Sequence, residues 1–129
     1  MQDNPDNSNH NPDVKLHLWL EENSGVYFGK GRYEILALID ELGSLKLAAE
    51  KLGMSYRGAW GKIKKTEEII GRKLITKEAN KEGYKLTAFG TRFINEFRNF
   101  QQEVLDFAKG KATEMLERLQ EHEQEQKKE

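Results

Sequence analysis

GSLKLAAEKLGMSYRGAWGKIKKTEEIIG, residues 43–71, decides the fold of this chain, because it contains two helices that only a short turn can join. Ser44 precedes a first helix with apolar residues at helical spacing, and Gly53 is placed to end that helix in a left-handed conformation. Ser55 then caps a second helix directly. The stretch predicts a helix-turn-helix whose second helix, residues 55–70, is presented to DNA.

Length and composition limit the classes of protein to consider. With 129 residues, of which 36% are apolar, the chain can build one modest core. It has no cysteine, and His10, His17 and His122 are scattered, so we expect no disulfide, no metal site and no cofactor. No apolar run reaches the roughly 18 residues of a membrane span, and no signal peptide opens the chain. We therefore expect a cytoplasmic protein with no membrane partner.

Charge is distributed unevenly along the chain. The formal net charge is -1, which by itself argues against a nucleic-acid partner. Residues 54–92, however, carry ten Lys or Arg and four Glu, a local charge of +6. The basic charge therefore coincides with the second helix of the motif and with the segment that follows it.

The N-terminal segment predicts a tail and a hairpin. Residues 1–13 are rich in Asn, Asp, Pro and Ser, so we expect a disordered tail. From Val14 to Leu20 apolar and polar residues alternate, which predicts a half-buried strand with Trp19 on its outward face. Residues 26–28 can return as a second short strand. Because an outward Trp often covers a partner surface, we assign Trp19 to an interface.

Two helices supply the expected core of the domain. Arg32 to Leu42 has apolar residues along one side, and we expect this helix to be scaffold behind the helix-turn-helix. In the second helix of the motif, Ala59 and Ile63 follow the spacing of a buried face. Trp60 lies at the edge of that face, and we favour core packing for it over exposure.

The outward side of the second helix carries the candidate DNA contacts. Tyr56 and Arg57 occupy its first turn, where recognition helices usually reach base edges. Ser55 can bind a phosphate as cap and donor, and the lysines suit other phosphates. The alternative is that these lysines form an ordinary solvated face. The predicted DNA-binding residues are Ser55, Tyr56, Arg57, Lys62, Lys64, Lys65, Arg72, Lys77, Lys81 and Lys85.

The pattern changes after the second helix to short apolar groups. Residues 74–75 and 84–86 flank a polar tip at 79–83 that contains glycine, which predicts a hairpin. The basic residues between 73 and 87 would then lie on the wing of a winged helix, next to the DNA backbone or the minor groove. A plain surface hairpin is the alternative, but a position directly after a basic helix favours a wing.

A long last helix follows, capped by Thr87. Its apolar stripe runs over residues 88–119, and the domain body can cover only the first part. The remainder needs a partner, so we infer a homodimer through this helix. We expect the charged tail, residues 120–129, to fray. The predicted dimer interface consists of Trp19, Phe97, Phe100, Val104, Phe107, Ala108 and Met115.

These patterns predict a mainly α fold with small β elements. The expected architecture is a winged helix-turn-helix with an N-terminal β-hairpin and a long C-terminal dimerisation helix. Its expected parts are a disordered tail at 1–13, the winged helix-turn-helix domain at 14–87, the dimerisation helix at 88–119 and a charged tail at 120–129.

The chain resembles the DNA-binding domain of ModE-type regulators, the molybdate-responsive transcription regulators, and more distantly the LysR-type winged helix. The resemblance covers about residues 14–119, and SYRGAW is its most specific part. It implies the same hairpin, winged helix-turn-helix and dimerising last helix. The matching segments are LHLWL (16–20), GSLKLAAEKLGMSYRGAW (43–60), IIGRKLI (69–75) and YKLTAFG (84–90).

One departure from this family bears on the ligand. Full-length ModE-type regulators carry C-terminal β-barrel modules that bind oxyanions, and this sequence ends in a charged tail where those modules would begin. The wing of the family is also rich in glycine, whereas here it reads ANKEG. We therefore carry over DNA binding alone and do not expect molybdate to bind.

The expected function is a sequence-specific, dimeric transcription regulator that binds double-stranded DNA. It would read a palindromic operator through the helix at 55–70 and the basic wing at 73–87. The alternative is a protein–protein interaction module that uses the winged helix and the exposed long helix. An enzyme is the weakest option, since there is no Cys, no His cluster and no phosphate-binding Gly loop, and helix pairing with nearby lysines explains Glu67 and Glu68.

Overall fold

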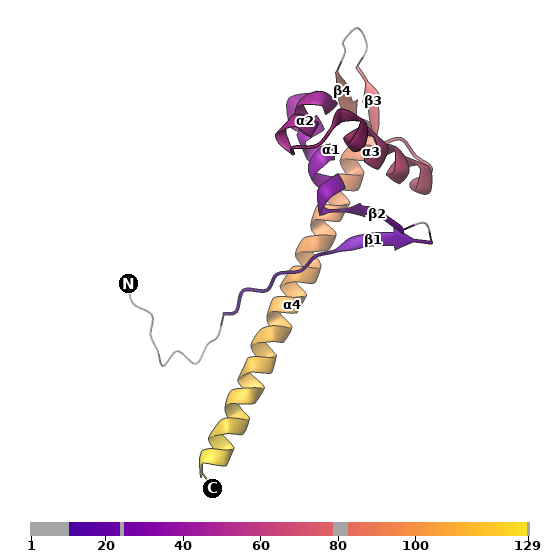
Figure 1. Cartoon of the computed structure of the whole chain (residues 1–129). Helices are drawn as coiled ribbons and strands as arrows, with labels where there is room; N and C mark the ends of the chain where they lie inside the picture. Colours follow the sequence, from indigo (N-terminus) through magenta and orange to yellow (C-terminus); the bar gives the residue numbers. More distant parts are fainter. Residues whose placement is uncertain (1–10, 24, 79–82, 129) are drawn as a thin grey trace. The chain divides into compact units, whose positions relative to one another are not determined.

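The computed structural model of the chain describes residues 11–23, 25–78 and 83–128. These residues form two compact units, His17–Asn99 and the segments on either side of it. The predicted fold class is confirmed, because the described elements are mainly helical, with two antiparallel hairpins and a long last helix. The elements are β1 (Trp19–Glu22), β2 (Gly25–Gly29), α1 (Lys30–Leu42), α2 (Leu45–Lys51), α3 (Tyr56–Ile70), β3 (Ile75–Lys77), β4 (Tyr84–Leu86) and α4 (Ala88–Lys128) (Figure 1).

Helices α2 and α3 form the predicted helix-turn-helix, and each begins after the serine that the sequence indicates. The Ser44 hydroxyl oxygen accepts a hydrogen bond from the backbone N–H of Leu47 at 3.0 Å. The Ser55 hydroxyl oxygen accepts from the N–H of Gly58 at 2.9 Å. Gly53 has a φ of +69°, a conformation that L residues rarely adopt, and it lets the chain turn sharply between the two helices. Both predicted caps are confirmed.

One apolar core holds this unit together. Helix α1 contributes Ile35, Leu36 and Ile39, which have no exposed surface, so its predicted role as scaffold is confirmed. Each fully buried side chain of this size stabilises the fold by about 1.5–3 kcal/mol relative to exposure. The other members of the core are Phe28, Leu45, Ala48, Ala49, Ala59, Ile63, Leu74, Ile75, Leu86, Ile94 and Phe97.

The N-terminal hairpin begins later than predicted. Strand β1 pairs antiparallel with β2, and the pairing starts with Trp19 opposite Gly29. Residues 11–18 have no regular secondary structure, so the prediction of a strand from Val14 was wrong before Trp19. The physical reason lies in β2, which ends at Gly29 where α1 follows. Residues before Trp19 therefore have no partner strand, and alternation alone cannot supply ladder hydrogen bonds.

Strands β3 and β4 form the predicted hairpin, and Thr87 joins it to the last helix. The N–H of Thr87 donates to the carbonyl oxygen of Leu74 at 2.9 Å. Its hydroxyl donates to the carbonyl oxygen of Lys73 at 2.7 Å and accepts from the N–H of Gly90 at 2.9 Å. Thr87 therefore caps α4, as predicted, and also fixes the start of α4 against Lys73 and Leu74, directly before β3.

The first turns of α4, up to Asn99, belong to the same unit. The rings of Phe93 and Phe97 stand edge-on to the ring of Phe28, with centroids 4.6 and 4.9 Å apart. Phe97 is only 5% exposed, so its assignment to the dimer interface was wrong. The same helical spacing continues along the whole of α4 and cannot show which apolar residues the chain itself covers.

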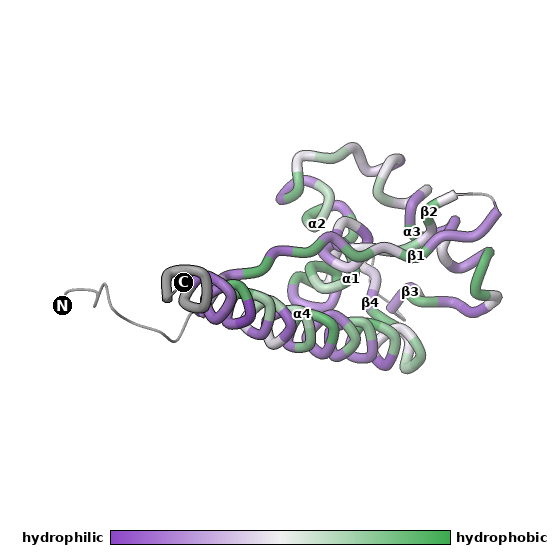
Figure 2. The backbone as a smooth tube through the Cα atoms, turned by 90° about the horizontal axis from the view of Figure 1, so that it is seen from below, coloured by the Kyte–Doolittle hydropathy of each residue, from purple (hydrophilic) through white to green (hydrophobic). Residues whose placement is uncertain are grey.

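The second unit contains α4 from Phe100 onward. The helix is continuous through Gly110 and through the charged segment, and it ends at Lys128. The sequence predicted fraying there, but Glu, Gln and Lys are good helix formers. Apolar residues recur between hydrophilic ones along this part of the helix (Figure 2). Phe107, Met115 and Leu119 are 67%, 49% and 55% exposed within the described residues, so the stripe is open to solvent at these positions.

Candidate nucleic-acid interface

The first turn of α3 presents two side chains to solvent. The Ser55 cap fixes where the helix begins, and Tyr56 and Arg57 follow it at exposed positions. Among the described residues no hydrogen bond or ion pair holds the Arg57 side chain, so its guanidinium is available to a base edge or a phosphate. A Cβ atom at Gly58 would lie 3.0 Å from the Ser55 hydroxyl oxygen, so glycine leaves room for the cap.

Trp60 lies on the exposed side of α3. Ala59 and Ile63 are fully buried, as predicted, but Trp60 is 36% exposed, so the favoured core packing was wrong. One residue corresponds to a rotation of about 100° along a helix, and that rotation moves Trp60 out of the face that Ala59 occupies. A shallow surface hollow on this side of α3 is lined by Tyr56, Arg57, Trp60 and Gly61.

The first turn of α3 also meets the base of the wing. Partial burial of the phenol raises the pKa of Tyr56, and its electrostatic interaction with the nearby Tyr84 raises that pKa further. The ammonium nitrogen of Lys77 lies 5.7 Å from the centroid of the Tyr84 ring. These contacts connect the exposed start of α3 to β3 and β4 through side chains.

Lys64 is held by an acidic residue of its own helix. Its Nζ lies 2.8 Å from Oε1 of Glu67 and 4.7 Å from the centroid of the Trp60 ring. Glu67 is 8% exposed, and its Oε2 accepts hydrogen bonds from the backbone N–H groups of Leu74 at 2.7 Å and Ile75 at 3.2 Å. Lys64 thus neutralises a buried carboxylate, a role that competes with its predicted contact to a phosphate.

The hydrogen bonds to Glu67 control its ionisation. Burial alone would raise the pKa of this carboxyl, but the bonds from Lys64 and the two backbone amides outweigh burial and lower the pKa. From the sequence alone, only the pairing of Glu67 with lysine could be predicted. The amide partners lie seven and eight residues further along the chain, around the start of β3, and they come within reach only in the folded domain.

The remaining predicted cations near α3 have different surroundings. The Nζ of Lys65 lies beside Gly25 at the start of β2, 3.6 Å from the position of a Cβ atom there. The guanidinium carbon of Arg72 lies 4.2 Å from the centroid of the Phe89 ring. Lys62 is exposed on α3. The predicted DNA-binding cations therefore fall into two groups: side chains that solvent surrounds, and side chains that contact other residues of the domain.

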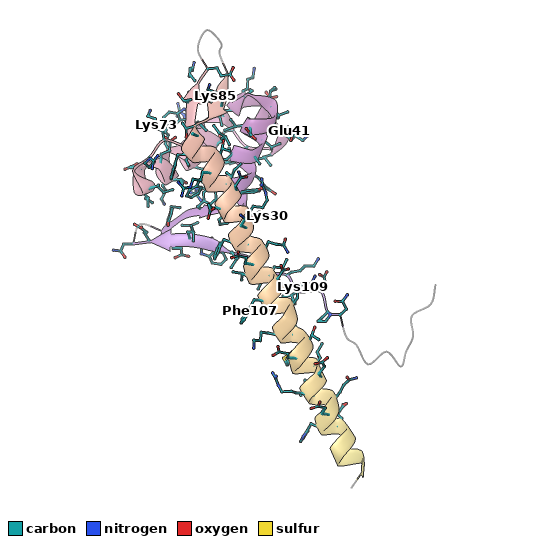
Figure 3. The ribbon with its side chains drawn as sticks, turned by 180° about the vertical axis from the view of Figure 1, so that it is seen from behind. Lys30, Glu41, Lys73, Lys85, Phe107 and Lys109 are labelled. Atoms are coloured by element: carbon teal, nitrogen blue, oxygen red, sulfur yellow. The ribbon has the colours of Figure 1, made fainter. Side chains whose placement is uncertain are left out.

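The wing adds exposed cations. Lys77 on β3 and Lys85 on β4 are exposed, and Lys81 lies outside the described residues. Lys73 is also exposed and lies just before β3; Figure 3 labels it together with Lys85. Lys73 was missing from the predicted set. Its position directly before the first wing strand is the signal that would have included it.

Most of the residues predicted to form the dimer interface are at least partly exposed to solvent in the single chain. Trp19 on β1 is 52% exposed, and its indole N–H donates to a carboxylate oxygen of Glu21. On α4, Phe107 stands out from the helix (Figure 3), and the Nζ of Lys111 lies 5.5 Å from the centroid of its ring. Phe100 and Met115 are exposed, and Val104 and Ala108 are half-buried.

The described part of the chain contains neither a candidate metal site nor a candidate membrane span. No group of three or more His, Cys, Asp or Glu side chains there could hold a metal ion. Within the same residues, no helix is both long and apolar enough to span a bilayer.

Comparison with known families identifies the helix-turn-helix. Residues 31–91 match the family model described as bacterial regulatory helix-turn-helix protein, lysR family. The matched stretch runs from α1 into the first turn of α4 and so includes α2, α3 and the wing. These residues carry a winged helix-turn-helix of the LysR type, a DNA-binding domain of transcription regulators. The likeness to the ModE type stays a prediction.

Two solved structures and one curated protein are similar to parts of this chain. The crystal structure of a CbnR_DBD–DNA complex is similar with a TM-score of 0.52 and 21% identity, over 64% of this chain and 95% of that one. VV2_1132, a LysR family transcriptional regulator, has a TM-score of 0.48 and 23% identity, over 57% of this chain and 25% of that one. The molybdenum-pterin-binding protein MopB of Rhodobacter capsulatus is 31% identical over 55 residues, which are 43% of this chain and 20% of MopB. The chain thus spans a small part of the length of the latter two proteins.

Proposed function

We propose that the chain is a sequence-specific, homodimeric DNA-binding regulator that reads a palindromic operator with α3 and the basic wing. The observation that carries the proposal is the exposed first turn of α3 in a LysR-type helix-turn-helix. Arg57 is exposed there, next to the Ser55 cap. An α-helix fits the major groove, and an arginine can bind O6 and N7 of a guanine at once.

The proposal assigns phosphate binding to cations that solvent surrounds. Lys62, Lys73 and Lys85 are exposed, and no ion pair holds them among the described residues. Each phosphate that such a cation neutralises releases counterions, so binding should weaken steeply with salt. The local charge of +6 over residues 54–92 in a chain of net charge -1 would orient this side of the protein toward DNA.

Dimerisation through α4 completes the proposal. Phe107, Met115 and Leu119 expose between 49% and 67% of their surface, which is costly for side chains of this kind in water. A second copy of the chain can cover them by packing its own α4 along the same stripe. A two-fold dimer would then place two α3 helices in major grooves about 10 base pairs apart, or a multiple of that distance.

Binding to labelled mixed-sequence duplex DNA, measured by fluorescence anisotropy at about 50 and 200 mM salt, tests the DNA-binding part of the proposal. We expect the affinity to fall between the two salt concentrations by a factor of roughly 10³ for a protein that makes six phosphate contacts. The variant Lys73→Ala/Lys85→Ala should bind more weakly and with a flatter salt dependence. Lys109→Ala, which removes an exposed lysine from α4, is the matched control and should change little.

A protein–protein interaction module is the second candidate, and the exposed stripe of α4 favours it. In that case a different protein, and not a second copy, would cover Phe107 and Met115. Sedimentation velocity over a range of protein concentrations distinguishes the two. A monomer at all concentrations, together with no affinity for DNA at low salt, would contradict the regulator and support the interaction module.

A further inference from the structure

The hollow lined by Tyr56, Arg57, Trp60 and Gly61, called the α3 hollow below, lies on the exposed side of the recognition helix. Two of its walls are aromatic, and Arg57 also lines it, with a guanidinium that no hydrogen bond or ion pair holds within residues 11–23, 25–78 and 83–128. Tyr56 and Trp60 are four residues apart and so lie on the same side of the helix. They are 47% and 36% exposed, so both rings present apolar surface to solvent.

Lys64 supports the orientation of the Trp60 ring. The Nζ of Lys64 lies 4.7 Å from the centroid of the indole ring, and the same Nζ is fixed 2.8 Å from Oε1 of the buried Glu67. Glu67 in turn accepts two hydrogen bonds from backbone amides. A chain of contacts therefore runs from the core to the ring, and this arrangement preorganises the wall of the α3 hollow.

Gly61 leaves the floor of the α3 hollow open. A Cβ atom at this position would meet no atom within 4 Å, so the space beside the helix backbone is empty. Glycine in the middle of a helix costs about 0.5–1 kcal/mol relative to alanine. The domain therefore carries an exposed aromatic wall and an open backbone where packing requires neither.

We propose that the α3 hollow receives the 5-methyl group of a thymine in the major groove, next to the base pair that Arg57 reads. Thymine presents a methyl group in the major groove, and apolar side chains read it by direct contact. A small apolar group fits between two aromatic walls, and the cation at the rim is attracted to the neighbouring phosphates and guanine acceptors. This inference rests on the proposed function, because it names a base that the same helix selects.

Replacing thymine by uracil tests the inference, because it removes the methyl group and leaves base pairing intact. The DNA is the duplex that the protein enriches from a random pool, with each thymine replaced in turn. We expect one thymine in each half-site at which wild-type affinity falls about fourfold, the factor that burying one methyl-sized group provides. Trp60→Ala should bind the thymine and uracil duplexes equally at that position.

The other tryptophan of the chain provides the control. Trp19→Ala removes an exposed indole from β1, and it should retain the fourfold ratio between the two duplexes even if its overall affinity changes. Circular dichroism confirms that each variant is folded, and the uracil series with the wild-type protein needs no variant.

Sequence-preferring binding with no effect of uracil at any position would overturn this inference and leave the proposed function standing. A ratio that Trp60→Ala retains would overturn it as well. Failure to enrich or bind any duplex would contradict the proposed function and this inference together.

Discussion

Substitution of Glu67 tests most sharply how α3 is connected to the start of the wing. Its carboxylate, 8% exposed, binds the amides of Leu74 and Ile75 on one side and the ammonium of Lys64 on the other. Glu67→Ala removes the acceptor and leaves both amides without a partner. Leu74 and Ile75 are themselves at most 1% exposed, so solvent reaches these amides poorly.

The magnitude follows from the two amides. A buried donor left without a hydrogen bond costs about 1–3 kcal/mol, so Glu67→Ala should lower the free energy of unfolding by roughly 2–6 kcal/mol. A domain of this size is stable by only about 5–15 kcal/mol. The loss should therefore lower the melting temperature by at least about 8 °C.

Urea unfolding followed by circular dichroism measures this loss. Glu68→Ala is the matched control, because Glu68 is the same residue type at the next position of α3 and is exposed. We expect the control to change the free energy of unfolding by less than about 0.5 kcal/mol. A loss for Glu67→Ala as small as that of the control would refute the role assigned to these hydrogen bonds.

The same carboxylate makes stability depend on pH. The pKa of Glu67 in the folded protein is lowered relative to the value of about 4.3 for an unfolded chain. Its stabilising contribution is therefore fully present above that pH and is lost as the pH falls through the lower, folded-state pKa. Glu67→Gln lacks the charge, so the difference in unfolding free energy between wild type and this variant should be constant above about pH 5 and shrink below about pH 4.

Three further predictions concern the helix caps, the start of α4 and the reading of DNA. Ser55→Ala removes the acceptor for the Gly58 amide and should lower the free energy of unfolding by about 0.5–2 kcal/mol; an unchanged urea midpoint would contradict the cap. Gly90→Ala would place a Cβ atom 2.2 Å from the Leu74 carbonyl oxygen and should destabilise the domain by about 1–3 kcal/mol or more. Gly61→Ala, whose Cβ atom meets no atom within 4 Å, should stabilise the helix slightly. Equal effects of the two variants in thermal unfolding would show that α4 does not approach the backbone of Leu74 this closely. Arg57→Ala should cost roughly 1–3 kcal/mol on the preferred duplex and relax its sequence preference, while Lys85→Ala should weaken binding to all duplexes similarly; specificity that survives Arg57→Ala in competition assays would remove Arg57 from base reading.

Local signals in the sequence were sufficient to predict the helix-turn-helix and the wing. Ser44, Ser55 and Thr87 each act through a backbone amide three residues further along, so their roles as caps can be recognised without knowledge of the fold. Gly53 likewise acts through its own backbone angle. Features of this kind depend on neighbours in the chain, and the structure confirmed them.

Features that depend on distant partners could not be predicted in this way. The alternating pattern from Val14 predicts a strand, but only β2 determines how much of that pattern finds a partner. Phe97 and Phe107 follow one helical spacing, yet Phe28 covers the first and no described residue buries the second. Glu67 has the sequence context of a surface residue, and its partners around the start of β3 come within reach only when the domain folds.

Selection of bound duplexes from a random pool tests the central claim most directly. The proposed two-fold dimer predicts an enriched inverted repeat whose half-sites are centred about 10 base pairs apart, or a multiple of that distance. The same selection with Arg57→Ala should enrich the repeat less strongly. A single, unrepeated motif would contradict the symmetric dimer, and the absence of any enriched sequence would contradict a sequence-specific regulator.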